Sequence, residues 1–114
     1  MKSNNSDHFA YIWEYIVKQD AVEEFRKVYG SGGDWVRLFR RSSGYIRTEL
    51  YQDVNNPHRF VTTDLWISKV HRDTFRKERA EEFELLDKEC ASLTETEQFL
   101  GDFLVQTPHT PDHI

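Results

Sequence analysis

The stretch from His8 to Lys18 constrains the fold of this chain more than any other feature. It contains no glycine or proline and is rich in aromatic and β-branched residues, a composition that favours an extended strand. In a strand, one face would carry Phe9, Tyr11, Trp13, Tyr15 and Val17, and the other face would carry Ala10, Ile12, Glu14 and Ile16. A strand that is largely apolar on both sides is typical of one that is covered on both faces.

Two helices are predicted after this strand. Asp20 is expected to cap the first, with Glu23 at the capping-box position and Gly30 at its end. Asp34 is expected to cap a second, short helix, which ends at Ser42-Ser43-Gly44.

The remainder of the chain is expected to contain three more strands and a long helix. The expected elements are strands at 45–54, 60–67 and 99–106, a turn at 55–57, a long helix at 70–91 and a helical turn at 94–97. In the last strand, alternation would place Phe99, Phe103 and Val105 on one face and Leu100 and Leu104 on the other.

This order of elements predicts the fold class α+β. It is the ferredoxin-like arrangement β-α-β-β-α-β with an extra short helix, in which right-handed crossovers put both major helices on one face of an antiparallel four-stranded sheet. The other face would be bare yet apolar, and a second copy of the chain is the simplest cover. The alternative is an open, half-polar sheet. We expect one domain at 8–106, a disordered N-terminus at 1–7 and an irregular tail at 107–114.

Charge and composition exclude several partners. With 114 residues the chain is one domain, and its net charge of −5 disfavours nucleic acid and anionic membrane surfaces. Cys90 is the sole cysteine, the N-terminus has no apolar core typical of a signal peptide, and no apolar run approaches a membrane span. The expected location is therefore the cytoplasm.

No motif predicts a metal or a cofactor. The glycine-rich stretch 30–33 follows a helix rather than a strand and lacks the remaining residues of a nucleotide-binding loop. No histidine pairs with Cys90 at metal-ligand spacing, and His109 and His113 are separated by a proline. We therefore expect no metal site and no cofactor.

Polar and aromatic residues within the strands are the remaining candidates for chemistry. Asp64 shares a strand face with Thr62 and Trp66, and a carboxyl is a poor choice for a purely apolar core. It either pairs with an arginine as a structural ion pair or serves a ligand. Trp13 and Glu49 are further candidates within strands.

Three segments together resemble one family. They are Glu14-Tyr15-Ile16-Val17-Lys18, Phe39-Arg40-Arg41-Ser42-Ser43-Gly44-Tyr45 and Leu65-Trp66-Ile67-Ser68-Lys69 with Phe75 beyond it. The chain resembles the antibiotic biosynthesis monooxygenase superfamily of dimeric α/β-barrel proteins over about residues 11–105. The resemblance implies a homodimer joined sheet to sheet, with the aromatic face of the first strand turned to the helices. Members include cofactor-independent oxygenases of polyketide anthrones and quinols, haem-degrading enzymes and many proteins of unassigned role.

The haem-degrading branch of the superfamily is a poor match. Trp66 corresponds to its tryptophan, but its asparagine position falls on Trp13 and its histidine position on Asp87. Without an imidazole there, the resemblance offers no axial iron ligand.

The oxygenase branch implies a cofactor-independent monooxygenase that acts on a small aromatic, phenolic substrate. Such an enzyme needs an apolar slot that excludes water, and the candidates to form it are Tyr11, Trp13, Tyr15 and Trp66. Trp13 and Trp66 would wall a cleft between the sheet and the long helix.

The same branch needs a base for the phenolic proton. Asp64 or Glu49 could be that base if burial raises its pKa. The alternative is a non-catalytic, dimeric member of the same fold that binds a small ligand or has a structural role.

Overall fold

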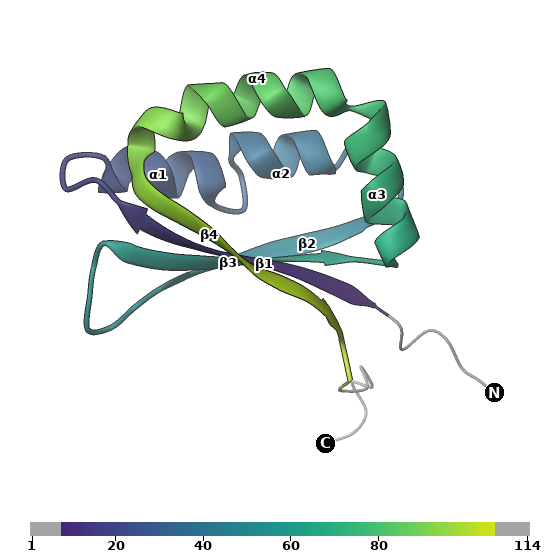
Figure 1. The fold of residues 1–114 in the computed structure, drawn as a ribbon, viewed down its shortest axis with the longest axis horizontal. Coiled ribbons are helices and arrows are strands. Elements are labelled where there is room, and N and C mark those ends of the chain that lie inside the picture. The colour runs from purple at the N-terminus through teal and green to yellow at the C-terminus, as the bar shows by residue number, and fades with distance from the viewer. Residues whose placement is uncertain (1–7, 107–114) are drawn as a thin grey trace.

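The computed structural model describes residues 8–106, which form an antiparallel sheet with helices on one face (Figure 1). The elements are β1 (Phe9–Val17), α1 (Val22–Tyr29), α2 (Asp34–Phe39), β2 (Tyr45–Gln52), β3 (Arg59–Trp66), α3 (Lys69–Glu78), α4 (Ala80–Cys90), a 3-10 turn (Ala91–Leu93) and β4 (Thr94–Leu104). The four strands lie in the order β2-β3-β1-β4. The α+β, ferredoxin-like arrangement is therefore confirmed, and the expectations for 1–7 and 107–114 lie outside the described residues.

The helix-covered face of the sheet holds the core. On β1 the buried residues are Phe9, Tyr11, Tyr15 and Val17, and on β3 they are Phe60, Thr62, Asp64 and Trp66. The strict alternation along β3 arises because successive side chains of a strand point to opposite faces. The aromatic side of β1 thus faces the helices, as expected.

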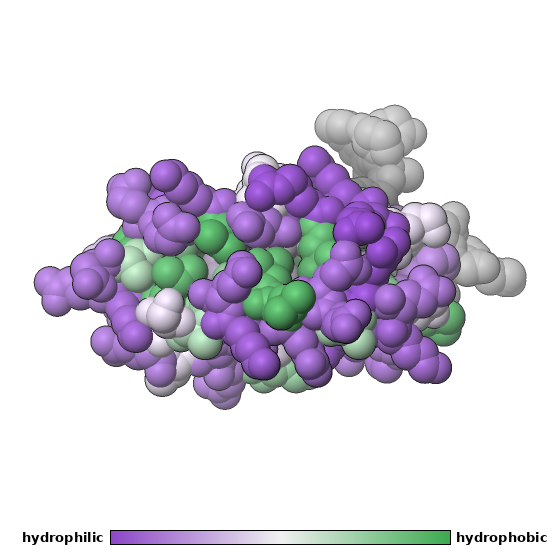
Figure 2. Space-filling view, turned by 90° about the horizontal axis from the view of Figure 1, so that it is seen from above, coloured by the Kyte–Doolittle hydropathy of each residue, from purple (hydrophilic) through white to green (hydrophobic). Residues whose placement is uncertain are grey.

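The outer surface of the helical layer is mostly hydrophilic. Figure 2 views the molecule from the helical side and shows polar side chains broken by a few apolar patches. Within residues 8–106, no helix has the length and apolar character needed to cross a membrane.

The opposite sheet face carries apolar side chains without a covering layer. Ile12 and Leu65 lie there half-buried, while Ile67 and Phe103 are 43% and 48% exposed. These residues belong to β1, β3, β4 and the residue that follows β3, so the apolar surface extends across neighbouring strands.

A bulge in β4 reverses the expected facing of its second half. Phe99 pairs with Trp13 on the helix-covered face, whereas Phe103 pairs with Ala10 on the bare face. The expectation that Phe99 and Phe103 share a face was wrong, because Leu100 is an extra residue in the ladder. Gly101 beside it has φ +143°, a backbone conformation that residues with a side chain rarely adopt.

The expected long helix at 70–91 is two helices that meet at Arg79. On a straight helix, Phe75 and Phe83 would stand about 12 Å apart along the axis. The bend brings their ring centroids to 6.5 Å, so both rings join one aromatic cluster. Packing in the core thus overrides the local helical pattern.

Three other boundaries differ from expectation. Residues 94–97 begin β4 instead of forming a helical turn. The N-cap of α1 is Ala21 and not the expected Asp20. Asp20 lies within a turn that precedes the helix, in which the Ala21 N–H donates to Lys18 O. Gly33 and not Asp34 is the N-cap of α2. Asp34 is the first residue of that helix, where its negative charge interacts favourably with the positive end of the helix dipole.

Candidate functional site

A cavity of about 210 Å³ lies between the helix-covered face of the sheet and the helices. Its aromatic walls are Tyr11, Trp13, Tyr15, Tyr29, Trp35, Phe39 and Phe83. Its polar lining residues are Thr48, Thr62, Asp64, Arg76, Asp87 and Glu97. Thr62 and Asp64 are buried sheet residues at the floor, whereas Arg76, Asp87 and Glu97 belong to exposed positions at the rim.

Asp64 is the acid at the floor of the cavity and is only 5% exposed. Burial raises the pKa of its carboxyl to about 7, although a hydrogen bond from Thr48 and the charge of Arg72 oppose that rise. The Thr48 hydroxyl donates to Asp64 Oδ1 at 2.6 Å and lies 2.7 Å from the Tyr45 hydroxyl. Since Thr48 has one proton to give, Tyr45 donates to Thr48 in turn. A carboxyl with this pKa can accept a proton near neutral pH.

Tyr15 and Thr62 form a second polar pair in the cavity lining. Their hydroxyl oxygens are 3.3 Å apart. Burial raises the pKa of Tyr15 well above its ordinary value, so its phenol stays protonated and can donate a hydrogen bond.

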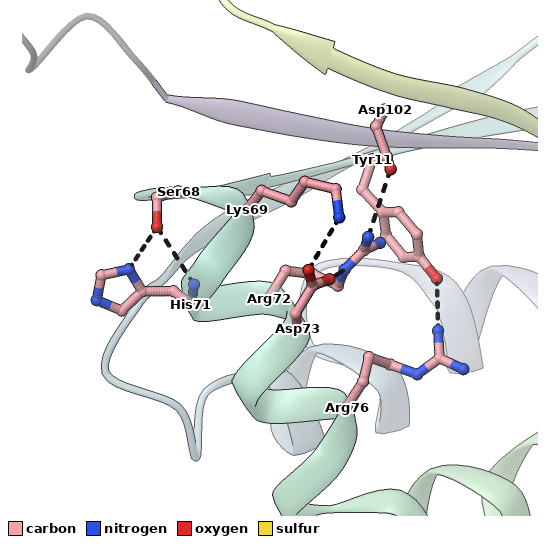
Figure 3. Close-up of polar contacts among 8 residues, drawn as sticks. All are labelled: Tyr11, Ser68, Lys69, His71, Arg72, Asp73, Arg76 and Asp102. Carbon is pink, nitrogen blue, oxygen red and sulfur yellow. Dashed lines mark hydrogen bonds and ion pairs between the residues drawn. The ribbon is translucent and has the colours of Figure 1, made fainter.

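Two arginines of α3 hold Tyr11 from different sides (Figure 3). Arg76 Nη1 donates to the Tyr11 hydroxyl at 3.1 Å, and the Arg72 guanidinium carbon lies 4.2 Å from the centre of the Tyr11 ring. Arg72 itself is ion-paired with Asp73 at 3.0 Å and with Asp102 at 3.5 Å. Because Arg76 donates to the Tyr11 oxygen, the proton of Tyr11 remains available for a ligand.

The structure brings four of the six residues singled out from the sequence to the cavity. Tyr11, Trp13, Tyr15 and Asp64 all line it. Their convergence follows from β1 and β3 being paired neighbours with these side chains on one face.

Trp66 lies outside the cavity wall. It is fully buried, with its ring packed against Phe39 at 5.7 Å, Tyr45 at 5.4 Å and Phe75 at 5.3 Å. Its indole N–H has no hydrogen-bond partner among the described residues. Trp66 is therefore not among the residues that line the cavity, and the second tryptophan in the lining is Trp35.

Glu49 is also absent from the cavity. It pairs with Thr63, which lies on the bare sheet face, and its carboxylate bonds to Tyr51 and to Arg47 at 3.1 Å. These two hydrogen bonds lower the pKa of Glu49. The position and the pKa both separate Glu49 from the chemistry of the cavity.

Sequence reasoning did not identify eight of the lining residues, which are Tyr29, Trp35, Phe39, Thr48, Arg76, Phe83, Asp87 and Glu97. The one available signal was that Arg76 and Phe83 are seven residues apart and would share a face of the single long helix expected at 70–91. In the structure they lie on α3 and α4, and the contact between them follows from the bend at Arg79. Within the described part of the chain, no group of three or more His, Cys, Asp or Glu side chains is arranged to hold a metal ion.

Comparison with models of known families identifies one family. A family model described as antibiotic biosynthesis monooxygenase matches residues 8–77, more than half of the chain. No curated protein matches the sequence.

Solved structures share the fold at low sequence identity. A putative antibiotic biosynthesis monooxygenase from Nitrosomonas europaea is 16% identical, with a TM-score of 0.69 over 96% of this chain and 100% of that chain. SnoaB, a cofactor-independent oxygenase from Streptomyces nogalater, is 21% identical, with a TM-score of 0.63 over 94% of this chain and 99% of that chain. PA3566 from Pseudomonas aeruginosa is 14% identical, with a TM-score of 0.65 over 92% of this chain and 100% of that chain.

Proposed function

Because the chain belongs to the antibiotic biosynthesis monooxygenase family, we propose that it is a cofactor-independent monooxygenase of a small phenolic compound. The observation that carries this proposal is Asp64, a buried carboxyl with a pKa of about 7 at the floor of an aromatic cavity. The likeness to SnoaB, described as a cofactor-independent oxygenase, supports it.

The reaction requires only the substrate, dioxygen and a base. The Asp64 carboxylate takes the phenolic proton and leaves an electron-rich phenolate. The phenolate gives one electron to O2, and the phenoxyl radical and superoxide then combine at a ring carbon to form a C–O bond. The peroxide takes the proton from Asp64, and its O–O bond breaks as the ring C–H proton leaves with the departing hydroxide as water. One phenol and one O2 thus yield one quinone and one water.

The lining residues suit the charges that develop in this reaction. The Tyr15 hydroxyl, which stays protonated beside Thr62 and feels the charge of Asp64, can donate to the phenolate oxygen. The aromatic walls exclude water, which strengthens that hydrogen bond and protects the radical pair.

The size of the cavity limits the substrate. An apolar cavity of about 150 Å³ accommodates benzene, so a cavity of about 210 Å³ suits an aromatic compound of one or two rings. A larger polycyclic substrate would have to extend beyond the rim.

Oxygen uptake with a panel of one- and two-ring phenols tests the proposal, with product mass as a second readout. We expect Asp64→Asn to lower the rate by about 10²–10⁴-fold, and Glu49→Gln to retain the parental rate because it lies on the other sheet face. An unchanged rate in Asp64→Asn would eliminate Asp64 as the base. Ligand binding without oxygen uptake across the panel would instead identify a non-catalytic, ligand-binding member of the family.

We also propose that the bare sheet face joins two copies of the chain. Apolar residues such as Ile12, Leu65 and Phe103 lie on that face, and burying them against an identical face would remove apolar surface from water. The charged residues there are already paired with one another, as in the contact between Arg47 and Glu49. An ion pair such as that of Arg47 and Glu49 could lie at the edge of the dimer interface without needing a charged residue from the second copy.

A further inference from the structure

The two ends of the cavity carry opposite charge. Arg76 contacts the tip of Tyr11 at one end. At the other end Glu97 stands opposite Tyr15 in the sheet, and its pKa is raised by burial and, to a smaller extent, by the negative charge of Asp87. A ligand with a charged group therefore has one favoured orientation.

Arg76 is the cation of this cavity, and its charge is not neutralised. Among residues 8–106 no carboxylate lies within ion-pair distance of its guanidinium, in contrast to Arg72, which pairs with Asp73 and Asp102. Its guanidinium carbon lies 4.0 Å from the centre of the Phe83 ring, so the group is already held in position. A guanidinium has five N–H donors, and within the described chain only the bond to Tyr11 uses one.

The surroundings of Arg76 favour an anion on its open side as well. A shallow hollow of about 420 Å³ adjoins the cavity through Arg76 and is also lined by Arg72, Lys77 and Asp73. The one carboxylate in this lining, that of Asp73, is already paired with Lys69 and Arg72. Lys77 makes no hydrogen bond or ion pair with any other described residue. The donors left on Arg76 match the planar, bidentate geometry of a carboxylate.

We propose that Arg76 binds a carboxylate on the substrate, so that the substrate class is aromatic acids with a phenolic hydroxyl. Asp64 stands opposite Tyr11 in the sheet and has a short side chain, whereas Arg76 contacts the tip of the Tyr11 ring. The hydroxyl and the carboxylate therefore belong at opposite ends of the aromatic ring system. The carboxylate cannot lie at the other end of the cavity without approaching Asp87 and Glu97.

The substrate class inferred here rests on the proposed function, because only an oxygenase would turn such an acid over. The role of Arg76 is tested by ligand binding alone, without turnover. Isothermal titration calorimetry without oxygen compares 6-hydroxy-2-naphthoate with its neutral carboxamide, which has nearly the same shape. We expect the acid to bind the wild-type protein about tenfold more tightly or better. Arg76→Gln should reduce this preference to about twofold or less, and Arg76→Lys should keep part of it.

Lys27→Gln is the matched control, because it removes one positive charge from an exposed position of α1 that lines neither hollow. It should retain the preference for the acid. Equal affinity of the wild-type protein for acid and amide would overturn the inference, as would a preference that persists in a folded Arg76→Gln protein. If the acid binds through Arg76 but no oxygen is consumed, the proposed oxygenase activity fails and the binding inference stands.

Discussion

Replacing Asp64 by Asn should make the protein more stable at pH 8 while lowering its activity. The folded protein holds the Asp64 proton up to a pKa of about 7, whereas the unfolded chain releases it near 3.8. The folded state therefore binds more protons in this window, and the free energy of unfolding falls as the pH rises from about 4 to about 7.

The magnitude follows from the same two pKa values. Each pH unit in the window is worth about 1.36 kcal/mol, so ionised Asp64 costs the fold about 4 kcal/mol above pH 7. Asn keeps the acceptor for Thr48 and carries no charge, but its amide adds a buried N–H₂. We expect a net gain of about 2–4 kcal/mol at pH 8 and little or no gain at pH 5.

Urea unfolding followed by tryptophan fluorescence measures both proteins at pH 5 and pH 8. Protein concentration must be held constant, because self-association would add to the apparent stability. If the wild-type protein and Asp64→Asn show the same change in stability between the two pH values, Asp64 titrates as an ordinary carboxyl. It would then lack the pKa that qualifies it as a base.

Three further results are expected. Thr48→Val removes the hydrogen bond that lowers the pKa of Asp64, so the midpoint of the pH–rate profile should rise by about one pH unit; an unmoved midpoint would contradict the contact. Gly101→Ala should cost about 1–3 kcal/mol in urea unfolding because of its φ of +143°, whereas Gly32→Ala, which meets open space, should change stability by about 0.5 kcal/mol or less; equal effects would refute the backbone argument. Light scattering should give twice the 13.6 kDa chain mass for the wild-type protein and the single mass for Leu65→Lys; a wild-type monomer at micromolar concentration would refute the dimer.

Local patterns predicted the elements whose cause is local. The alternation along β1 put Tyr11 and Trp13 on one face of that strand, and the alternation along β3 put Asp64 and Trp66 on one face of the other, because a strand has a fixed side-chain period. That both faces turn toward the helices was expected from the family resemblance alone. The bend at Arg79 has no local signal such as proline or glycine, since it follows from the joint burial of Phe75 and Phe83.

Long-range register explains what the sequence could not reveal about the site. Glu49 was a reasonable base until its pairing with Thr63 placed it on the bare face. Trp66 shares a strand face with Asp64, but Phe39 and Phe75 from the helices bury it in the core. Arg76 became a candidate only through its contact with Tyr11, a residue 65 positions earlier in the chain.

The strand order has a consequence for how the chain folds. β1 is a central strand, yet its partner β4 lies far along the chain, and Phe9 pairs with Leu104. Pairings between residues so distant in sequence slow folding, because a large loop must close before they form. Until β4 arrives, β1 presents an open edge on a strand that is apolar on both sides, which is a template for wrong pairing with other chains. Aggregation during refolding should therefore depend mainly on how quickly the β1–β4 pair closes.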